Sequence, residues 1–563
     1  MIPIANQPFT TYIITSSVKL VFTCMLASST DLHVFVLQII MLLHTFIVII
    51  LPLVNAGSEE WYKIARDSLT EQLKVKPNNN IAKNVILFIG DGLGMPTITA
   101  SRIYKGQKMG KTGEETVLKF EEFPYVALSK TYGSDRQIPD SSQTATALMC
   151  GAKTNFYIAG CNDNVKQGNC SAETPSNKLT SILDHFIADG RSGGFVTTAR
   201  LTHATPAASY ANTANRLWEY DGAMKNVVGG CKDIAYQFVH ENADIQVALG
   251  GGRRNFLPNT TIDPEYNSTK GWRQDGVNLI AHWSNIQQSK GRKYKYVWNT
   301  EQFNAVDPAS TDYLLGLFEP SHMQYEVERN KGSDGEPSIT DMVSKAIQIL
   351  KKNPKGFFLM VEGSNIDIAH HDTLAAKALS ETVSMEAAVI KAVELTNEAD
   401  TLIIVTGDHS HVFSMGGYNY RGNDILGLAN PTDYEPPLDG MPYTTLSYGN
   451  GPGVNFTAGR QNLTNVDTRS FNYKPQAAVP VEYETHGGED VPIFSRGPMA
   501  HLLSGVKEEH YVAHVMQYAA CVGDFKNDKH CTSPTTETTC SATHITRNLI
   551  GSVLFFVLYL LIA

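Results

Sequence analysis

The chain alternates between short, continuous apolar runs and stretches with helical periodicity. The clearest runs are Val85–Gly90, Gly194–Thr198, Phe357–Val361 and Thr401–Val405. A strand inside a parallel sheet is buried on both faces, so it is apolar throughout instead of alternating with polar residues. The pattern therefore predicts an α/β fold with a large central, mostly parallel sheet flanked by helices.

Residues of the types that bind metal follow all four runs. Asp91 comes directly after the first run, Glu362 directly after the third, and Asp408 with His409 shortly after the fourth. His203 lies a few residues beyond the second run. Because the carboxyl ends of parallel strands meet at one edge of a sheet, we expect these side chains to converge there.

Two further segments add ligands to this edge. Asp367 and His371 are four residues apart, so on a starting helix they share one face and can reach the same ion. His486 begins a His-Gly-Gly-Glu-Asp stretch and is a further candidate. Mixed imidazole and carboxylate ligands suit zinc, whereas carboxylate, hydroxyl and water ligands suit magnesium. The sequence thus predicts that both kinds of ion share the crevice.

Ser141 is the candidate nucleophile. It stands in Pro139-Asp140-Ser141-Ser142, ahead of small residues and a helical stretch, which predicts a position at a helix N-terminus. The backbone N–H groups and the dipole there favour an anion. Taken alone, the same residues also fit an ordinary helix cap. No Gly-x-Ser-x-Gly motif surrounds the serine, so a zinc ion would have to stabilise its alkoxide.

Eight segments in order resemble those of animal membrane-bound alkaline phosphatases, over roughly residues 57–540. They are Asn84–Gly94, Pro139–Ser141, Thr202–Ala207, Asn215–Arg216, Val361–Gly363, Asp367–His371, Asp408–Phe413 and Glu484–Asp490. The resemblance implies an alkaline phosphatase that hydrolyses a broad range of phosphate monoesters through a phosphoserine, with two zinc ions and one magnesium ion. It also implies a large sheet with an inserted crown region and an N-terminal helix.

The resemblance also assigns roles to individual residues. Ser141 would be the nucleophile and Arg216 would clamp the phosphate. The metal ligands would be Asp367, His371 and His486 for the first zinc, Asp91, Asp408 and His409 for the second, and Asp91, Thr205, Glu362 and, through water, His203 for magnesium. The chain departs from the family at Ser142 and Gln143, where Ala and Gly are usual, and at Ile368, where His is common. None of these departures removes a proposed ligand.

Two outlying regions are interpreted through the same resemblance. The amphipathic stretch Glu59–Lys76 resembles a helix that embraces the second subunit of a homodimer, although packing on its own domain fits the pattern as well. Residues 417–481 resemble the crown insertion. Glu265, Phe318, Glu319 and Glu336 resemble the family's calcium site, and ordinary surface acids would explain the same residues nearly as well.

Composition indicates an exported globular protein. The net charge of −10 offers no basic stripe, so we expect no nucleic-acid partner. Eight cysteines fit an oxidising compartment. By resemblance Cys170 pairs with Cys231 and Cys521 with Cys531, while Cys150 is expected to be buried and free, and Cys161 and Cys540 are unassigned. Glycosylation sequons stand at Asn169, Asn259, Asn267, Asn455 and Asn462.

The two ends of the chain predict a lipid-anchored protein on the extracellular face of the plasma membrane. Residues 1–56 read as a signal region that ends at Val54-Asn55-Ala56, with Met41 as an alternative start and a signal anchor as the alternative reading. Residues 541–563 read as a GPI-attachment signal, with the anchor expected within 538–542. Residues 57–540 would form a single catalytic domain.

Two other functions remain open at this point. A phosphodiesterase or sulfatase of the same superfamily would use a similar centre. The magnesium ligands and Arg216 argue against it, because a diester lacks the oxygen charge that these groups would balance. A catalytically silent surface receptor is the other alternative, and the intact set of ligands argues against it. A chromogenic monoester and a matched diester would separate all three.

Overall fold

The computed structural model describes residues 58–430, 436–453 and 459–532. The chain divides into two compact units, Met1–Lys76 and Pro77–Ala563. In the first unit, residues 58–72 form a helix whose apolar side chains Trp61 and Leu69 are exposed, as is Leu73 directly after it. The predicted signal region, the predicted GPI signal, Cys540 and the sequon at Asn455 lie outside the described residues.

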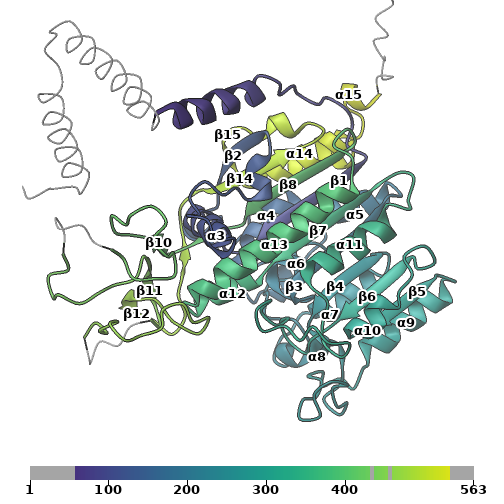
Figure 1. Ribbon diagram of the computed structural model, residues 1–563. Helices are drawn as coiled ribbons and strands as arrows, with labels where there is room; N and C mark the ends of the chain where they lie inside the picture. Colours follow the sequence, from purple (N-terminus) through teal and green to yellow (C-terminus); the bar gives the residue numbers. More distant parts are fainter. Residues whose placement is uncertain (1–57, 431–435, 454–458, 533–563) are drawn as a thin grey trace, which may run out of the picture. The chain divides into compact units, whose positions relative to one another are not determined.

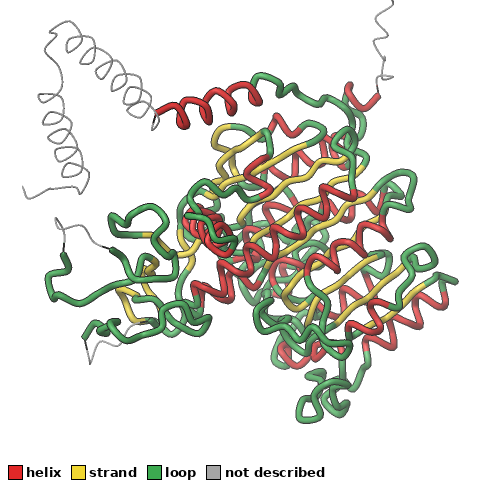
Figure 2. The backbone as a smooth tube through the Cα atoms, viewed as in Figure 1, coloured by secondary structure: helices red, strands yellow, loops and turns green. Residues whose placement is uncertain are grey.

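A ten-stranded sheet is the centre of the second unit (Figures 1 and 2). In spatial order its strands are β15 (Gly505–Glu508), β2 (Tyr125–Lys130), β14 (Val491–Arg496), β8 (Thr401–Gly407), β1 (Asn84–Gly90), β7 (Phe357–Gly363), β3 (Ser192–Arg200), β4 (Val247–Gly251), β6 (Tyr313–Leu317) and β5 (Tyr294–Val297). Only β14 runs antiparallel to its neighbours. The predicted mostly parallel sheet is therefore confirmed, and the four apolar runs lie in β1, β3, β7 and β8.

The helices of the second unit follow in chain order. They are α3 (Met95–Lys108), α4 (Ser141–Cys150), α5 (Ile182–Ala188), α6 (Ala204–Ala207), α7 (Ile234–Tyr236), α8 (Arg253–Phe256), α9 (Leu279–Ser289), α10 (Thr300–Asn304), α11 (Ile339–Leu350), α12 (Asn365–His371), α13 (Ala375–Leu395), α14 (Tyr511–Ala520) and α15 (Lys529–Thr532).

Two hydrophobic cores lie on the two faces of the sheet. Val85 and Leu87 of β1 belong to the core that contains α5 and α14, whereas Ile86 and Phe88 belong to the core that contains α11 and α13. Successive side chains of a strand point to opposite faces, so a strand with both faces covered must be apolar at every position. All seven residues of β1 are buried accordingly.

Two small sheets extend the edge where the strands end. The first joins β10 (Phe413–Met415), β11 (Leu446–Gly451) and β12 (Ala477–Pro480), of which β11 and β12 fall in the predicted crown. The second pairs β13 (His486–Gly487) with β9 (Ser410–His411), with His486 opposite His411. This pairing carries the distant His486 to the end of β8.

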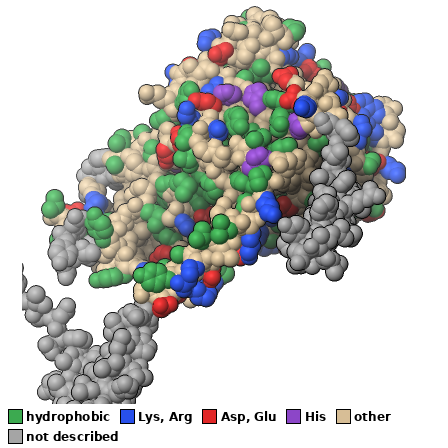
Figure 3. Space-filling model, turned by 90° about the horizontal axis from the view of Figure 1, so that it is seen from above, with side chains coloured by type: hydrophobic (Ala, Val, Ile, Leu, Met, Phe, Trp, Pro, Cys, Tyr) green, Lys and Arg blue, Asp and Glu red, His purple; other side chains and the backbone are tan. Residues whose placement is uncertain are grey.

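Two disulfides, Cys170–Cys231 and Cys521–Cys531, are present as the resemblance implies. Cys161 is free and buried, and Cys150 is free but only partly buried, so its expected complete burial is wrong. On the face shown in Figure 3, acidic and basic side chains are interspersed and histidine side chains reach the surface. Within the described ranges, no helix is both long and apolar enough to cross a membrane.

Candidate metal centre and nucleophile

The register of three neighbouring strands brings the predicted acids together. Gly90 at the end of β1 pairs with Gly407 of β8 on one side and with Gly363 of β7 on the other. Asp91 and Asp408 therefore follow the ends of the adjacent strands β1 and β8. Glu362 is the second-last residue of β7 and pairs with Ile89 of β1. All three side chains are fully buried. Such a cluster of like charges needs a cation or protons to be stable.

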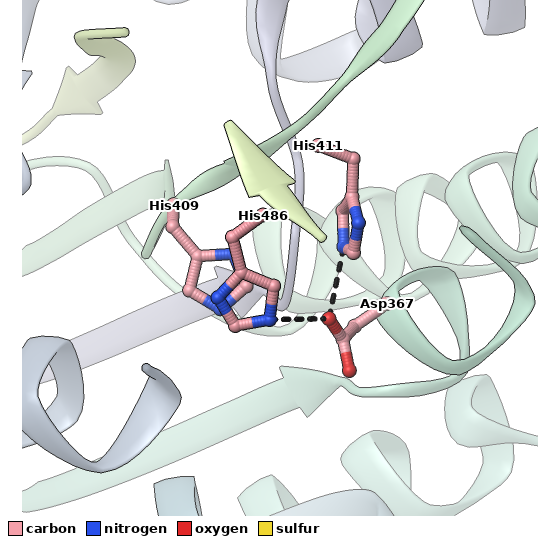
Figure 4. Close-up of side chains that lie close together, drawn as sticks. All are labelled: Asp367, His409, His411 and His486. Carbon is pink, nitrogen blue, oxygen red and sulfur yellow. Dashed lines mark hydrogen bonds and ion pairs between the residues drawn. The ribbon is translucent and has the colours of Figure 1, made fainter. Parts of the chain in front are cut away.

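Asp367, His371 and His486 form the first group of converging ligand atoms. Nε2 of His371 and Nε2 of His486 lie 3.3 and 3.4 Å from Asp367 Oδ1, and 3.2 Å from each other. Figure 4 shows His486 and Asp367 facing each other across the site. The Nδ1 atoms of the two histidines donate to backbone carbonyls, at 2.5 Å for His371 and 2.7 Å for His486. This arrangement leaves each Nε2 free for a metal ion.

Protonation favours the same interpretation. Burial lowers the pKa of His371 to about 4, so this imidazole is neutral, as a metal ligand must be. Burial likewise holds the pKa values of His409 and His203 well below the ordinary value of 6.5. Neutral imidazoles beside buried carboxylates, such as His371 and His409, are donors that suit zinc.

His411 and Glu484 are two residues whose roles the sequence did not reveal. His411 Nε2 lies 2.9 Å from Asp367 Oδ1, and its Nδ1 lies 2.5 Å from Glu484 Oε2 (Figure 4). Burial lowers the pKa of His411, but the carboxylates of Glu484 and Asp367 outweigh this effect and raise it to about 10. His411 therefore orients Asp367. No local sequence pattern could have found this pair, because its bond joins residues 73 positions apart.

Asp91, Asp408 and His409 form the second group, with Ser141 beside it. His409 Nε2 lies 3.3 Å from Asp91 Oδ1 and 3.4 Å from Asp408 Oδ2. Ser141 Oγ lies 3.2 Å from His409 Nε2 and 3.4 Å from Asp91 Oδ1. The predicted nucleophile thus lies among the predicted ligands of the second zinc.

Asp91, His203 and Glu362 form the third group, with ligand atoms within 4.8 Å of one another. Asp91 Oδ2, Glu362 Oε1, His203 Nδ1 and the nearby candidate Thr205 Oγ1 are buried without a hydrogen-bond partner among the described residues. Burial, with neighbouring carboxylates, raises the pKa of Glu362 to about 7 and that of Asp408 to about 6. Unpartnered buried oxygens and crowded carboxylates both fit a bound cation.

The candidate nucleophile, Ser141, stands at the start of α4, as predicted. Asp140 is the N-cap, and its Oδ2 accepts hydrogen bonds from Ser142 N at 3.2 Å and from Ser142 Oγ at 2.5 Å. The same oxygen accepts from Arg216 Nη1 at 3.0 Å, and Arg216 Nη2 donates to His203 Nε2 at 3.0 Å. Asp140 therefore links the nucleophile helix to the arginine expected to bind phosphate.

Gln143, the second departure from the family, holds the same turn. Its Oε1 accepts from Asp140 N at 3.2 Å, and its Nε2 donates to Thr154 O at 2.9 Å and to Asp135 Oδ1 at 3.0 Å. A glycine at this position would make none of these bonds. The larger side chain thus fixes the cap instead of blocking the site.

The four calcium candidates lie near one another at the other half of the sheet. Glu265 pairs with Arg253 at 2.9 Å, Glu319 accepts from Tyr266 OH at 3.0 Å, and Phe318 is buried. Glu336 accepts from Gln324 N at 2.8 Å, while its Oε2 has no partner among the described residues. Burial and the neighbouring acids raise the pKa of Glu319 to about 7 and that of Glu336 to about 9.

Alkaline phosphatases are similar to this chain in sequence. A family model described as alkaline phosphatase matches residues 82–522. The tissue-nonspecific alkaline phosphatase of Homo sapiens is 49% identical over 478 residues, covering 84% of this chain and 90% of that protein. An alkaline phosphatase of Gadus morhua is 46% identical over 470 residues, covering 82% of this chain and 97% of that protein.

Solved structures agree at the level of the fold. The alkaline phosphatase of Thermus thermophilus superposes on this chain with a TM-score of 0.57 at 22% sequence identity. The match covers 79% of this chain and 92% of the Thermus chain. A mutant of the alkaline phosphatase from the Antarctic bacterium TAB5, solved with Mg bound in its M3 site, gives a TM-score of 0.54 at 22% identity, covering 79% of this chain and 99% of its own.

Proposed function

Since the chain belongs to the alkaline phosphatase family and is a phosphoric monoester hydrolase, we propose that it works through a phosphoserine formed on Ser141. The observation that carries this proposal is the position of Ser141 Oγ, 3.2 Å from His409 Nε2 and 3.4 Å from Asp91 Oδ1. A serine held between groups of the second ligand set is placed for activation by a cation.

The donor sets fit two zinc ions and one magnesium ion. We assign Asp367, His371 and His486 to the first zinc, Asp91, Asp408 and His409 to the second, and Asp91, Thr205, Glu362 and, through water, His203 to magnesium. When bound, such cations offset the phosphate dianion and lower the pKa of a nearby oxygen. His411 and Glu484 hold Asp367 in the orientation that the first site requires.

In the proposed reaction, Ser141 is the nucleophile and Arg216 binds the phosphoryl group. Ser141 Oγ gives up its proton and attacks phosphorus, its bond to phosphorus forms as the bond to the ester oxygen breaks, and the leaving alkoxide takes up a proton from solvent to depart as the alcohol. In the second step, water attacks from the opposite side, and the phosphoserine bond breaks to release inorganic phosphate. Arg216, with its planar fork, holds two of the non-bridging oxygens, and Asp140 sets its position.

Trapping the covalent intermediate tests this function. Acid-quenched enzyme incubated with phenyl phosphate should carry phosphate on the peptide that contains Ser141, and Ser141→Ala should lose both this mark and several orders of magnitude of kcat. Ser142→Ala, at the adjacent position, is the matched control and should keep the mark. A Ser141→Ala variant with more than about a tenth of the parental kcat, a barrier change below about 1.4 kcal/mol, would disprove the assignment.

A calcium ion at Glu265, Phe318, Glu319 and Glu336 is part of the proposal as a structural site. The unpartnered Glu336 Oε2 and the raised pKa values of Glu319 and Glu336 support it. Arg253 already neutralises part of the charge of Glu265. Calcium should therefore raise the Tm of the parent and leave the Tm of Glu336→Gln unchanged.

We further propose an extracellular, GPI-anchored homodimer whose catalytic domain spans residues 57–540. Two disulfides fit an oxidising compartment, and the sequons at Asn169, Asn259, Asn267 and Asn462 are exposed and accessible to glycosylation. Exposed Trp61, Ile64 and Leu69 in the helix of residues 58–72, and Leu73 directly after it, offer an apolar surface for a second subunit.

A further inference from the structure

A group of cationic and aromatic side chains adjoins the proposed centre on the side of His203. The ring of His322 lies 5.0 Å from that of His203 at nearly a right angle, and His203 accepts a hydrogen bond from Arg216. Arg200 Nη1 donates to His322 Nε2 in turn. Arg200, His322 and the neighbouring Arg254 and Trp272 are called the Arg254 platform below.

Within this platform, Arg200 is already neutralised. Its Nε and Nη2 bind the two carboxylate oxygens of Glu219 at 2.8 and 2.6 Å. Glu219 Oε2 also accepts from Thr202 and Asn255, at 2.6 and 2.9 Å. The carboxylate of Glu219 therefore already binds four donor groups, and none of them belongs to Arg254.

Arg254 has no such partner. Its guanidinium lies over the ring of Trp272, with Cζ 3.4 Å from the ring centroid. Its Nε is buried without an acceptor, and among the described residues no hydrogen bond or ion pair joins its guanidinium to a protein acceptor. Burial, with the charge of Arg200, lowers the pKa of Arg254 to about 10. Glu219 acts on this cation only through its charge and without a direct bond, so the guanidinium is held in place and an anion beside it would be stabilised.

Two short segments connect the platform and its partner Glu219 to the proposed centre. Glu219 follows Arg216 by three residues and Arg200 precedes His203 by three, and three residues span at most about 11 Å. Tyr220 continues the same segment and packs on Trp272, with ring centroids 5.4 Å apart. Trp272 is 41% exposed and Arg254 is partly exposed, so the stacked pair lies at the border of the surface.

We propose that Arg254, held flat on Trp272, binds a second anionic group carried by the alcohol part of a phosphate monoester. This inference rests on the proposed function, because the phosphoryl group must be bound at Ser141 and Arg216. A planar guanidinium stacked on an aromatic ring presents its terminal N–H groups in a fork that matches a carboxylate or phosphonate. The enzyme then still accepts a broad range of monoester substrates but prefers those whose alcohol part carries a carboxylate or phosphonate.

Matched substrates test the proposal. The kcat/KM of parent and Arg254→Gln is measured for 3-carboxyphenyl phosphate, 3-phosphonophenyl phosphate and the neutral isostere 3-carbamoylphenyl phosphate. The variant should lose about tenfold on the two anionic substrates, and less than twofold on the neutral one, as expected for one charge-assisted contact. A loss on only one anionic substrate identifies which group the site takes and supports the proposal.

Two further variants separate recognition from folding. Trp272→Leu, which removes the surface that holds the guanidinium, should show a smaller selective loss. Arg292→Gln is the control, since Arg292 also lies over a ring, that of Tyr313, at the edge formed by β5 and β6, and it should show none. Equal losses on all three substrates, or no loss, would overturn the proposal. Absent phosphorylation of Ser141 in the parent would instead overturn the proposed function.

Discussion

At the residue scale, Asp140 joins the two parts of the site that handle phosphate. It caps the helix that begins with Ser141 and holds Arg216 through the same carboxylate. Its Oδ2 accepts from Ser142 N, Ser142 Oγ and Arg216 Nη1, so these donors share one oxygen. The hydroxyl of Ser142 therefore competes with Arg216 for the charge of Asp140.

Ser142→Ala should tighten the hold of Asp140 on Arg216, because one competing donor is removed. We expect the inhibition constant for inorganic phosphate to rise by about fivefold, the equivalent of about 1 kcal/mol for one hydrogen bond, while Ser141 is still phosphorylated. Competitive inhibition assays on parent and variant measure this. Ser142→Thr keeps a hydroxyl and should behave as the parent. An unchanged or lowered constant in Ser142→Ala would contradict the competition.

Single residues differ in how far the sequence reveals them. Asp91 and Asp408 were predictable, because an acid after an apolar run has no role in packing and lies at the functional edge of the sheet. His411 and Glu484 were not, because their bond joins residues 73 positions apart and depends on the pairing of β9 with β13. No local pattern carries that information.

At the element scale, helix starts were predictable and small sheets were not. The turn residues before Ser141 predicted the start of α4, and the spacing of Asp367 and His371 predicted their shared helix, α12, both of which the structure confirms. Strands of two residues, such as β9 and β13, have no recognisable periodicity. They are nevertheless the elements that bring His486 opposite His411.

Removing a proposed ligand from α12 and removing one from β7 should deplete different metal ions. His371→Ala, on α12, should remove one of the two proposed zinc ions and keep magnesium, whereas Glu362→Ala, on β7, should chiefly remove magnesium. Metal analysis after dialysis, by mass spectrometry, measures both. His282→Ala, on the distant helix α9, is the control and should keep all three ions. Full occupancy in both active-site variants would contradict the proposed ligand sets.

Glu381 of α13 should make stability depend on pH. Burial first, and Glu326 second, raise its pKa from 4.5 to about 8, and the carboxyl accepts from Glu326 N at 2.6 Å. Between these values the folded state binds the extra proton, so this contribution to stability is present below about pH 4.5 and is lost as pH rises through about 8. Glu381→Gln keeps an acceptor without a charge. It should have a higher Tm than the parent at pH 9 and the same Tm at pH 5.

The exposed Glu394 of the same helix provides the matched control for Glu381. It pairs with Lys391 at the surface, where such pairs contribute little. Glu394→Gln should therefore show the parental dependence of Tm on pH. A Glu381→Gln variant whose Tm falls as steeply as that of the parent between pH 5 and pH 9 would show that folding does not raise the pKa of Glu381.

At the scale of the whole molecule, the parallel centre of the sheet was predictable and its edge was not. Strands β1, β3, β7 and β8 each contain an apolar run and are buried along almost their whole length, which reflects their position between two covered faces. β2 alternates between buried and exposed residues, and β14 joins it antiparallel, so these strands carry no signal of a doubly covered sheet. The order of strands depends on long-range pairing that periodicity does not encode.

The anchor is the last property of the whole molecule that the sequence predicts, and it can be tested on cells. If the apolar tail after residue 549 is exchanged for a glycolipid, a phosphatidylinositol-specific phospholipase should release active enzyme. A chain ending before Thr543 should be secreted and active, because every proposed catalytic residue lies at or before His486. A protein tail that spans the membrane would resist the lipase, since no covalent bond joins it to a lipid head group. Membrane retention after lipase treatment, with tail peptides still present in the mature protein, would disprove the anchor.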